Sequence, residues 1–178
     1  MNVELPSGVW PVMITPFHGN GEIDWKGVDA LVEWYVGAGV AGLFAVCLSS
    51  EMYKLSPDER VCLADRVVER AAGRVPGVAA GAFGASLKEQ AAAARRLADT
   101  GLAAVVLTAN QFVAKGESDE AWRGKAELFF EACGDIPLGL YECPEPYHRT
   151  LSPEMLRWAS QSGRVFFFKD TCCRRGQI

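Results

Sequence analysis

Six apolar segments follow one another at regular intervals along the chain, and a helix-like segment comes after each of the first five. The apolar segments begin near residues 9, 42, 75, 102, 136 and 165, which gives roughly one strand–helix unit per 30 residues. Short apolar runs rich in β-branched and aromatic residues are typical of strands buried on both faces of a parallel sheet. The alternation therefore predicts an α/β fold.

The helix-like segments carry recognisable start signals. Ser56, Pro57 and Glu59 fit the N-cap, first and third positions of a helix, and Ser86 with Glu89 repeats this capping box. We expect five helices, which begin near residues 24, 56, 86, 119 and 152.

Two architectures fit this alternation, a doubly wound sheet and a β/α barrel. The first expected strand, Val9–Thr15, ends in Thr-Pro-Phe and lacks the glycine-rich turn that usually marks a doubly wound sheet. We therefore favour a TIM (β/α)8-type barrel. Such a barrel typically needs about 250 residues, so we expect this chain of 178 residues to form a single domain, residues 1–178, with about six of eight βα units.

Charge and composition exclude several classes of function. The chain has 18 basic and 22 acidic residues and no extended basic run, so neither nucleic acid nor a membrane surface is an expected partner. No spanning apolar run or signal-peptide pattern occurs, which predicts a cytoplasmic protein. Six cysteines form no Cys-x-x-Cys pair and the two histidines, His18 and His148, lie far apart. We expect reduced thiols and no metal site.

Reactive residues gather where the expected strands end, which is where β/α barrels build their sites. Tyr141 and Lys169 end successive strands, 28 positions apart, so we expect them on adjacent strands at the same level. The remaining candidates at strand ends are Thr15, Ser49, Ser50, Glu51, Asn110 and Gln111.

Lys169 is the candidate nucleophile because it directly follows the apolar run Val165–Phe168. Burial disfavours an ammonium group, and a neutral lysine amine can attack a carbonyl to form a Schiff base. A phenol beside it, from Tyr141, suits the proton transfers of carbonyl chemistry. The alternatives are a Lys169 that points into solvent or pairs with Asp170, and a Tyr141 that only closes the top of the barrel.

The order and spacing of several short motifs identify a family. The chain resembles the pyruvate-dependent class I aldolases and lyases that include dihydrodipicolinate synthase and N-acetylneuraminate lyase, from about Gly8 to Thr171. The matching segments are Gly8-Val-Trp-Pro-Val-Met-Ile-Thr-Pro-Phe17, Gly42-Leu-Phe44 with Glu51, Leu55-Ser-Pro-Asp-Glu-Arg60, Tyr141-x-x-Pro144 and Phe168-Lys169-Asp170.

The resemblance implies roles for individual residues. Lys169 would form the Schiff base with pyruvate or another 2-oxo acid, and Tyr141 would donate and accept protons. Ser49 would bind the substrate carboxylate, with Ser50 beside it as a second substrate-binding residue. The resemblance also implies an aldehyde as second reactant, no metal or organic cofactor, and a homo-oligomer.

Departures from the family pattern affect proton transfer above all. Leu48 stands where the family has a hydroxyl that relays protons to the tyrosine, and Asn110 and Gln111 stand where its synthases often have tyrosines. The family's arginine after the tyrosine motif corresponds only loosely to Arg149. These departures indicate a lyase with an altered substrate. The alternatives are a catalytically inactive, truncated barrel fragment and a 2-oxo acid binding protein without turnover.

Overall fold

Helices and strands alternate along the part of the chain that the computed structural model describes, residues 5–173. Residues 1–4 and 174–178 of the predicted single domain lie outside this part. The elements are, in order, α1 (Trp25–Gly37), β1 (Leu43–Val46), the short 3-10 helix η1 (Leu48–Ser50), α2 (Pro57–Ala71), β2 (Gly77–Ala80), α3 (Leu87–Ala98), β3 (Ala104–Thr108), α4 (Asp119–Cys133), β4 (Leu138–Tyr141), α5 (Pro153–Gln161) and β5 (Val165–Lys169).

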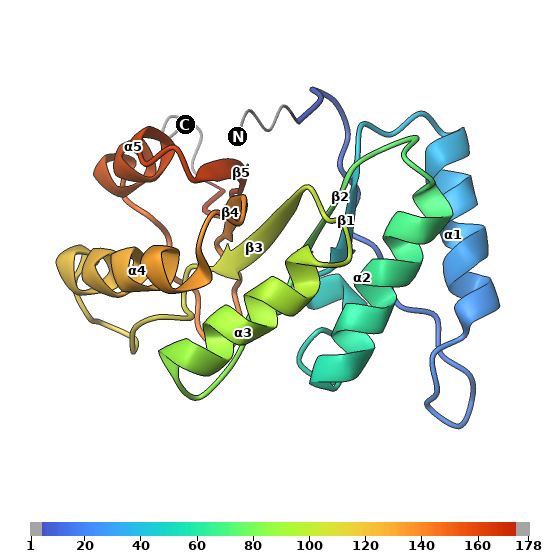
Figure 1. The fold of residues 1–178 in the computed structure, drawn as a ribbon, viewed down its shortest axis with the longest axis horizontal. Coiled ribbons are helices and arrows are strands. Elements are labelled where there is room, and N and C mark those ends of the chain that lie inside the picture. Colours follow the sequence, from blue (N-terminus) through green and yellow to red (C-terminus); the bar gives the residue numbers. More distant parts are fainter. Residues whose placement is uncertain (1–4, 174–178) are drawn as a thin grey trace.

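The five strands form one parallel sheet in the order β1-β2-β3-β4-β5. Each strand lies beside the next strand in the sequence, whereas a doubly wound sheet reverses its order part-way. The helices follow one another along one side of the sheet, from α1 at the right of the view to α5 at the left (Figure 1). The predicted partial β/α barrel is confirmed.

The first predicted strand, Val9–Thr15, is not a regular strand, and this prediction was wrong. The segment runs beside β1 but forms a single parallel bridge, between Val12 and Phe44. Pro11 has no N–H to give to a ladder, and Val9 and Ile14 are 68% and 55% exposed. An apolar run was therefore mistaken for a buried strand.

The predicted burial of the last strand also needs correction. Every residue of β1 to β4 is buried, but all five residues of β5 are only half-buried. Among the described residues β5 pairs with β4 alone, so one side of this strand has no neighbour to cover it.

Aromatic side chains fill the concave side of the sheet. The Phe44 ring on β1 lies 5.9 Å from the Tyr141 ring on β4 and 5.7 Å from the Phe167 ring on β5. Trp10, from the segment before β1, lies 5.5 Å from Phe167. Residues from opposite ends of the sheet thus touch, which requires the sheet to curl as a barrel does.

The predicted capping residues hold the helix starts. The Ser56 hydroxyl accepts from the Glu59 amide at 3.2 Å, and the Glu59 carboxylate accepts from the Ser56 amide at 2.8 Å. Ser86 and Glu89 make the same reciprocal pair. Asp24 caps α1 by accepting from the Gly27 amide at 3.0 Å.

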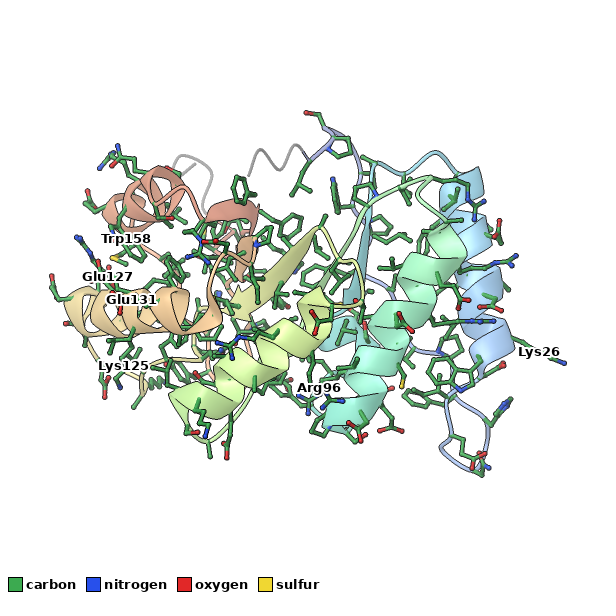
Figure 2. The ribbon with its side chains drawn as sticks, in the orientation of Figure 1. Lys26, Arg96, Lys125, Glu127, Glu131 and Trp158 are labelled. Atoms are coloured by element: carbon green, nitrogen blue, oxygen red, sulfur yellow. The ribbon has the colours of Figure 1, made fainter. Side chains whose placement is uncertain are left out.

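One tryptophan anchors the last two helices to each other. Trp158 lies between α5 and α4 (Figure 2), where its ring stacks on Phe130 at 5.7 Å and meets the Trp122 ring at 6.1 Å. The Arg123 guanidinium lies 5.3 Å from the same ring. Because α5 leads directly into β5, this packing helps to position the strand that carries Lys169.

None of the helices among residues 5–173 has the length and apolar character needed to cross a membrane.

Candidate active site

Tyr141 and Lys169 face each other at the C-terminal ends of β4 and β5. They are register partners in the sheet, and the Lys169 Nζ lies 4.1 Å from the centroid of the Tyr141 ring. The prediction that these residues occupy adjacent strands at the same level is confirmed. The face of a phenol ring attracts a cationic amine, so the tyrosine also fixes where the lysine head group lies.

The Tyr141 side chain is almost fully enclosed. The residue is 3% exposed, and the edge of its ring meets Phe44. Burial raises the pKa of the Tyr141 hydroxyl, and the nearby Cys143 thiol adds to the effect. The phenol therefore keeps its proton in the resting site and can donate it.

The two serines after β1 have different environments. Ser50 is fully buried, and its hydroxyl accepts from the Cys47 amide and lies 2.7 Å and 3.0 Å from the carbonyl oxygens of Met13 and Ala45. Ser49 is exposed, and its hydroxyl has no hydrogen-bond partner among residues 5–173. Of the two hydroxyls, that of Ser49 is free to meet a ligand.

Two further strand-end candidates support this turn. The Thr15 hydroxyl donates to the Ser50 carbonyl at 2.9 Å, which ties the segment before β1 to η1. Glu51, which has a left-handed backbone at φ 59°, pairs with Lys54 at 2.7 Å. Both residues shape the loop rather than present a reactive group.

Glu142 fixes the chain directly after Lys169. Its carboxylate accepts from the Leu151 amide at 2.7 Å and from the Thr171 amide at 3.2 Å, and its own amide donates to the Lys169 carbonyl at 3.2 Å. Burial raises the pKa of Glu142 above its ordinary value, although the two backbone hydrogen bonds act in the opposite direction. The sequence had not pointed to this role.

Potential metal ligands also meet at this point. Glu142, Asp170 and Cys172 are the group among the described residues whose carboxylate oxygen and sulfur atoms lie within 4.8 Å of one another. Two backbone amides already bind the Glu142 carboxylate, and Asp170 accepts from the Cys172 amide at 2.6 Å. We interpret these three side chains as a clamp on the segment after Lys169.

Asn110 organises the loop that follows Tyr141. It is 6% exposed, and its Nδ2 donates towards the carbonyl oxygens of Cys143, Glu145 and Tyr147 at 2.9, 2.8 and 2.6 Å. The neighbouring Gln111 donates to the Ala82 carbonyl at 2.9 Å. Asn110 and Gln111 therefore hold backbone in place.

Tyr53 is a site residue that the sequence reasoning missed. It lies in the loop after η1, yet its hydroxyl donates to the Glu145 carbonyl at 2.8 Å and lies 3.8 Å from the Cys143 Sγ. Its ring stacks on Phe83 at 5.2 Å, and the Arg60 guanidinium lies over Phe83 at 5.0 Å. Only its place after a strand end could have indicated this role.

Two polar residues of the loop after Cys143, Arg149 and His148, meet partners in other segments. Arg149 donates to Asp119 at 2.6 Å and to the Glu117 carbonyl at 2.9 Å, so it anchors the start of α4. His148 is exposed, as the sequence predicts, and its Nε2 lies 3.0 Å from the Thr171 hydroxyl. The six cysteines, all of which lie within residues 5–173, form no disulfide bond.

Comparison with known proteins shows the family to which the chain belongs. The model of the dihydrodipicolinate synthetase family matches residues 5–174. The chain belongs to this family. A 4-hydroxy-tetrahydrodipicolinate synthase from Roseobacter denitrificans is 31% identical over 163 residues, which are 92% of this chain and 54% of the relative.

Solved structures of this family share the fold. A dihydrodipicolinate synthase from Acinetobacter baumannii complexed with pyruvate has a TM-score of 0.82 at 24% identity, over 93% of this chain and 55% of that one. A prophage protein of the family from E. coli K12, also in complex with pyruvate, has a TM-score of 0.83 at 24% identity, over 96% and 56%. The chain spans about half the length of the curated relatives it matches.

Proposed function

We propose that this chain carries the Schiff-base machinery of a carbon–carbon lyase or aldolase that acts on pyruvate or another 2-oxo acid, with an aldehyde as second reactant. The observation that carries the proposal is the Lys169 Nζ, 4.1 Å from the Tyr141 ring at the C-terminal edge of the sheet. Family membership supports the class of reaction, and the pyruvate complexes of two structural relatives support the substrate class.

The chemistry follows from these two side chains. The Lys169 amine, once it has lost its proton, attacks the 2-oxo carbon and forms a carbinolamine, which loses water to give a protonated Schiff base. Loss of a C3 proton then gives an enamine that attacks the aldehyde, and lyase action runs the same steps in reverse. Tyr141, protonated at rest, supplies and recovers the protons that these steps exchange.

The serine turn after β1 completes the proposed substrate site. The unpartnered hydroxyl of Ser49 suits a carboxylate oxygen of the 2-oxo acid. Ser50, whose hydroxyl is bound by backbone groups, contributes by holding the turn that presents Ser49. No group in this scheme requires a metal or an organic cofactor.

Trapping with borohydride tests the proposal. After incubation with pyruvate and reduction, we expect a peptide that carries a reduced pyruvyl group on Lys169. The Lys169→Arg variant should show no adduct, while Lys125→Arg, which changes an exposed lysine on α4, should label like the original chain. Labelling that is absent, or that spreads equally over other lysines, would refute the Schiff-base role.

Binding without turnover is the second candidate function. It is favoured by the open side of the described sheet at β5, because half-buried Lys169 lies on that strand. An adduct on Lys169 with no exchange of pyruvate C3 hydrogen for deuterium would support a binding protein over a lyase.

A further inference from the structure

The buried Tyr141 hydroxyl needs a route by which protons reach solvent. The residue is only 3% exposed, and Leu48, Asn110 and Gln111 leave it without the hydroxyl groups expected from the family pattern. A phenol that gives a proton to the substrate must recover one before the next cycle. The side chains next to Tyr141 therefore decide whether it can act repeatedly.

Cys143 is the first of these side chains. It follows Tyr141 by two residues and is fully buried, and its thiol lies near enough to the Tyr141 hydroxyl to help raise the pKa of that hydroxyl. On its other side the Cys143 Sγ lies 3.8 Å from the Tyr53 hydroxyl. The sulfur thus lies between two phenol groups.

Tyr53 brings this contact to the surface. The residue is 42% exposed, so water reaches it, while its stacking on Phe83 and its bond to the Glu145 carbonyl hold its hydroxyl towards Cys143. Asn110 holds the same stretch of backbone, because its Nδ2 donates to the carbonyl oxygens of Cys143 and Glu145. Both ends of the contact are therefore held by separate interactions.

We propose that Cys143 and Tyr53 form a proton path that connects the buried Tyr141 hydroxyl to solvent. The proposal rests on the Schiff-base function and assigns two further residues to it. When Tyr141 has given its proton to the substrate, the Cys143 S–H donates to the phenolate, and the Tyr53 O–H turns from the Glu145 carbonyl to donate to the sulfur. A water molecule then donates to Tyr53 and leaves hydroxide in the solvent. Each of the three side chains ends with the proton count that it had at the start.

The chemistry of the groups suits this transfer. Burial raises the pKa of the Tyr141 hydroxyl, so its phenolate favours taking a proton back from a neighbouring S–H group. Burial raises the pKa of the Tyr53 hydroxyl, which disfavours a phenolate at Tyr53 and favours its prompt reprotonation by water. The opposite direction, when Tyr141 accepts a proton from the substrate, uses the same three contacts.

The first test measures proton exchange without any substrate. Nuclear magnetic resonance of Cζ-labelled tyrosines reports the exchange of the Tyr141 hydroxyl hydrogen with water. We expect Tyr53→Phe and Cys143→Ala to slow this exchange by about tenfold or more, and Cys143→Ser, which keeps a donor and acceptor, to remain close to the original rate. Equal rates in the original chain, Tyr53→Phe and Cys143→Ala would overturn the proposal.

The second test measures catalysis. Deuterium incorporation at C3 of pyruvate should fall in Tyr53→Phe and Cys143→Ala by about 10-fold or more, up to the ~10²–10⁴ that a positioned proton donor contributes, while borohydride trapping at Lys169 stays unchanged. Equal loss of trapping and exchange would overturn the proposal in favour of a structural role. If the original chain fails to trap pyruvate, the Schiff-base function fails, and the hydroxyl exchange still decides the proton path.

Matched controls separate the path from general effects. Tyr35→Phe changes a partly buried tyrosine of α1, and Cys133→Ala changes a buried cysteine of α4 whose thiol donates to the Phe130 carbonyl. Neither should alter the exchange of the Tyr141 hydroxyl. A slowing in these controls as large as in Tyr53→Phe would also overturn the proposal.

Discussion

Gly42 shows how tightly the interior beside β1 is filled. A Cβ atom at this position would overlap three atoms of the Trp10 ring. Trp10 in turn touches Phe167 on β5. The absence of a side chain at residue 42 therefore allows the contact that joins the two ends of the curled sheet.

We expect Gly42→Ala to lower the free energy of unfolding by about 1–3 kcal/mol, the usual cost of forcing extra volume into a packed interior. Urea unfolding followed by tryptophan fluorescence measures this. Gly37→Ala is the control, because a Cβ there meets nothing within 4 Å and lies in the last turn of α1, where alanine favours helix. Equal losses in both variants would contradict the assigned clash.

Glu142, in the clamp after Lys169, makes the stability of the folded protein depend on pH. Burial raises its pKa above the ordinary value of 4.5. The folded protein therefore holds this proton to higher pH than the unfolded chain does, and stability falls as the pH rises from 4.5 through the folded pKa.

Glu142→Gln should remove this contribution. We expect the stability of the original chain relative to the variant to decline as the pH rises through that window, and to level off above it. Urea unfolding of both proteins at a series of pH values measures the difference. The pKa of Asp170 is lowered from 3.8, by its bond to Cys172 first and by Glu142 as well, so Asp170 titrates below this window. A difference that grows with pH would show that Glu142 is stabilised as a carboxylate.

At the scale of elements, α1 and α2 are joined by charged pairs on their outer faces. Arg66 on α2 donates to both carboxylate oxygens of Asp29 on α1, at 2.7 and 2.6 Å. This bond lowers the pKa of Asp29 below its ordinary value of 3.8. The benefit is fully present above pH 3.8 and is lost as the pH falls through the lower folded pKa.

Asp29→Asn should therefore destabilise the protein at neutral pH by about 1 kcal/mol or less, because partly exposed ion pairs contribute little. The gap between the two proteins should close as the pH falls below 3.8. Thermal unfolding from pH 7 to pH 3 checks this. The matched control is Asp65→Asn, which changes an aspartate of α2. A difference in stability that persists at pH 3 would contradict a contribution from the charge of Asp29.

The elements themselves were predictable because their determinants are local. Five of the six predicted strands and the capped starts of the helices rest on short runs of residues, such as Ser56 to Glu59. The segment around Pro11 fails because an apolar run alone does not show whether its amides have partners. β5 was predicted as a buried strand for the same reason, since burial depends on which strands lie beside it.

The candidate site was predictable only where the sheet itself fixes geometry. Parallel strands one helix apart bring Tyr141 and Lys169 into register, so their spacing in the sequence was enough. Tyr53 and Asn110 meet partners that lie 33 to 92 positions away in the sequence. Such contacts depend on how loops fold over the sheet, and no local pattern encodes them.

At the scale of the whole molecule, the last strand of the described sheet has backbone N–H and C=O groups without a strand partner on one edge, and apolar side chains beside them. β5 pairs only with β4 among residues 5–173, and beside it lies a groove of about 420 Å³. Leu156, Val165, Phe166 and Phe168 line this groove. Unpaired edge strands with apolar flanks tend to pair with another chain.

We predict that the chain associates with further copies of itself through this edge. Sedimentation velocity at rising protein concentration should show growing oligomers. Phe166→Lys places a charge in the groove and should shift the distribution towards monomer, whereas Leu128→Lys changes a side chain on α4 that is already 54% exposed and should leave association intact. A monomer at every concentration, or an equal effect of both variants, would show that β5 is not the contact between copies. The homo-oligomer expected from the family resemblance would then need a different surface.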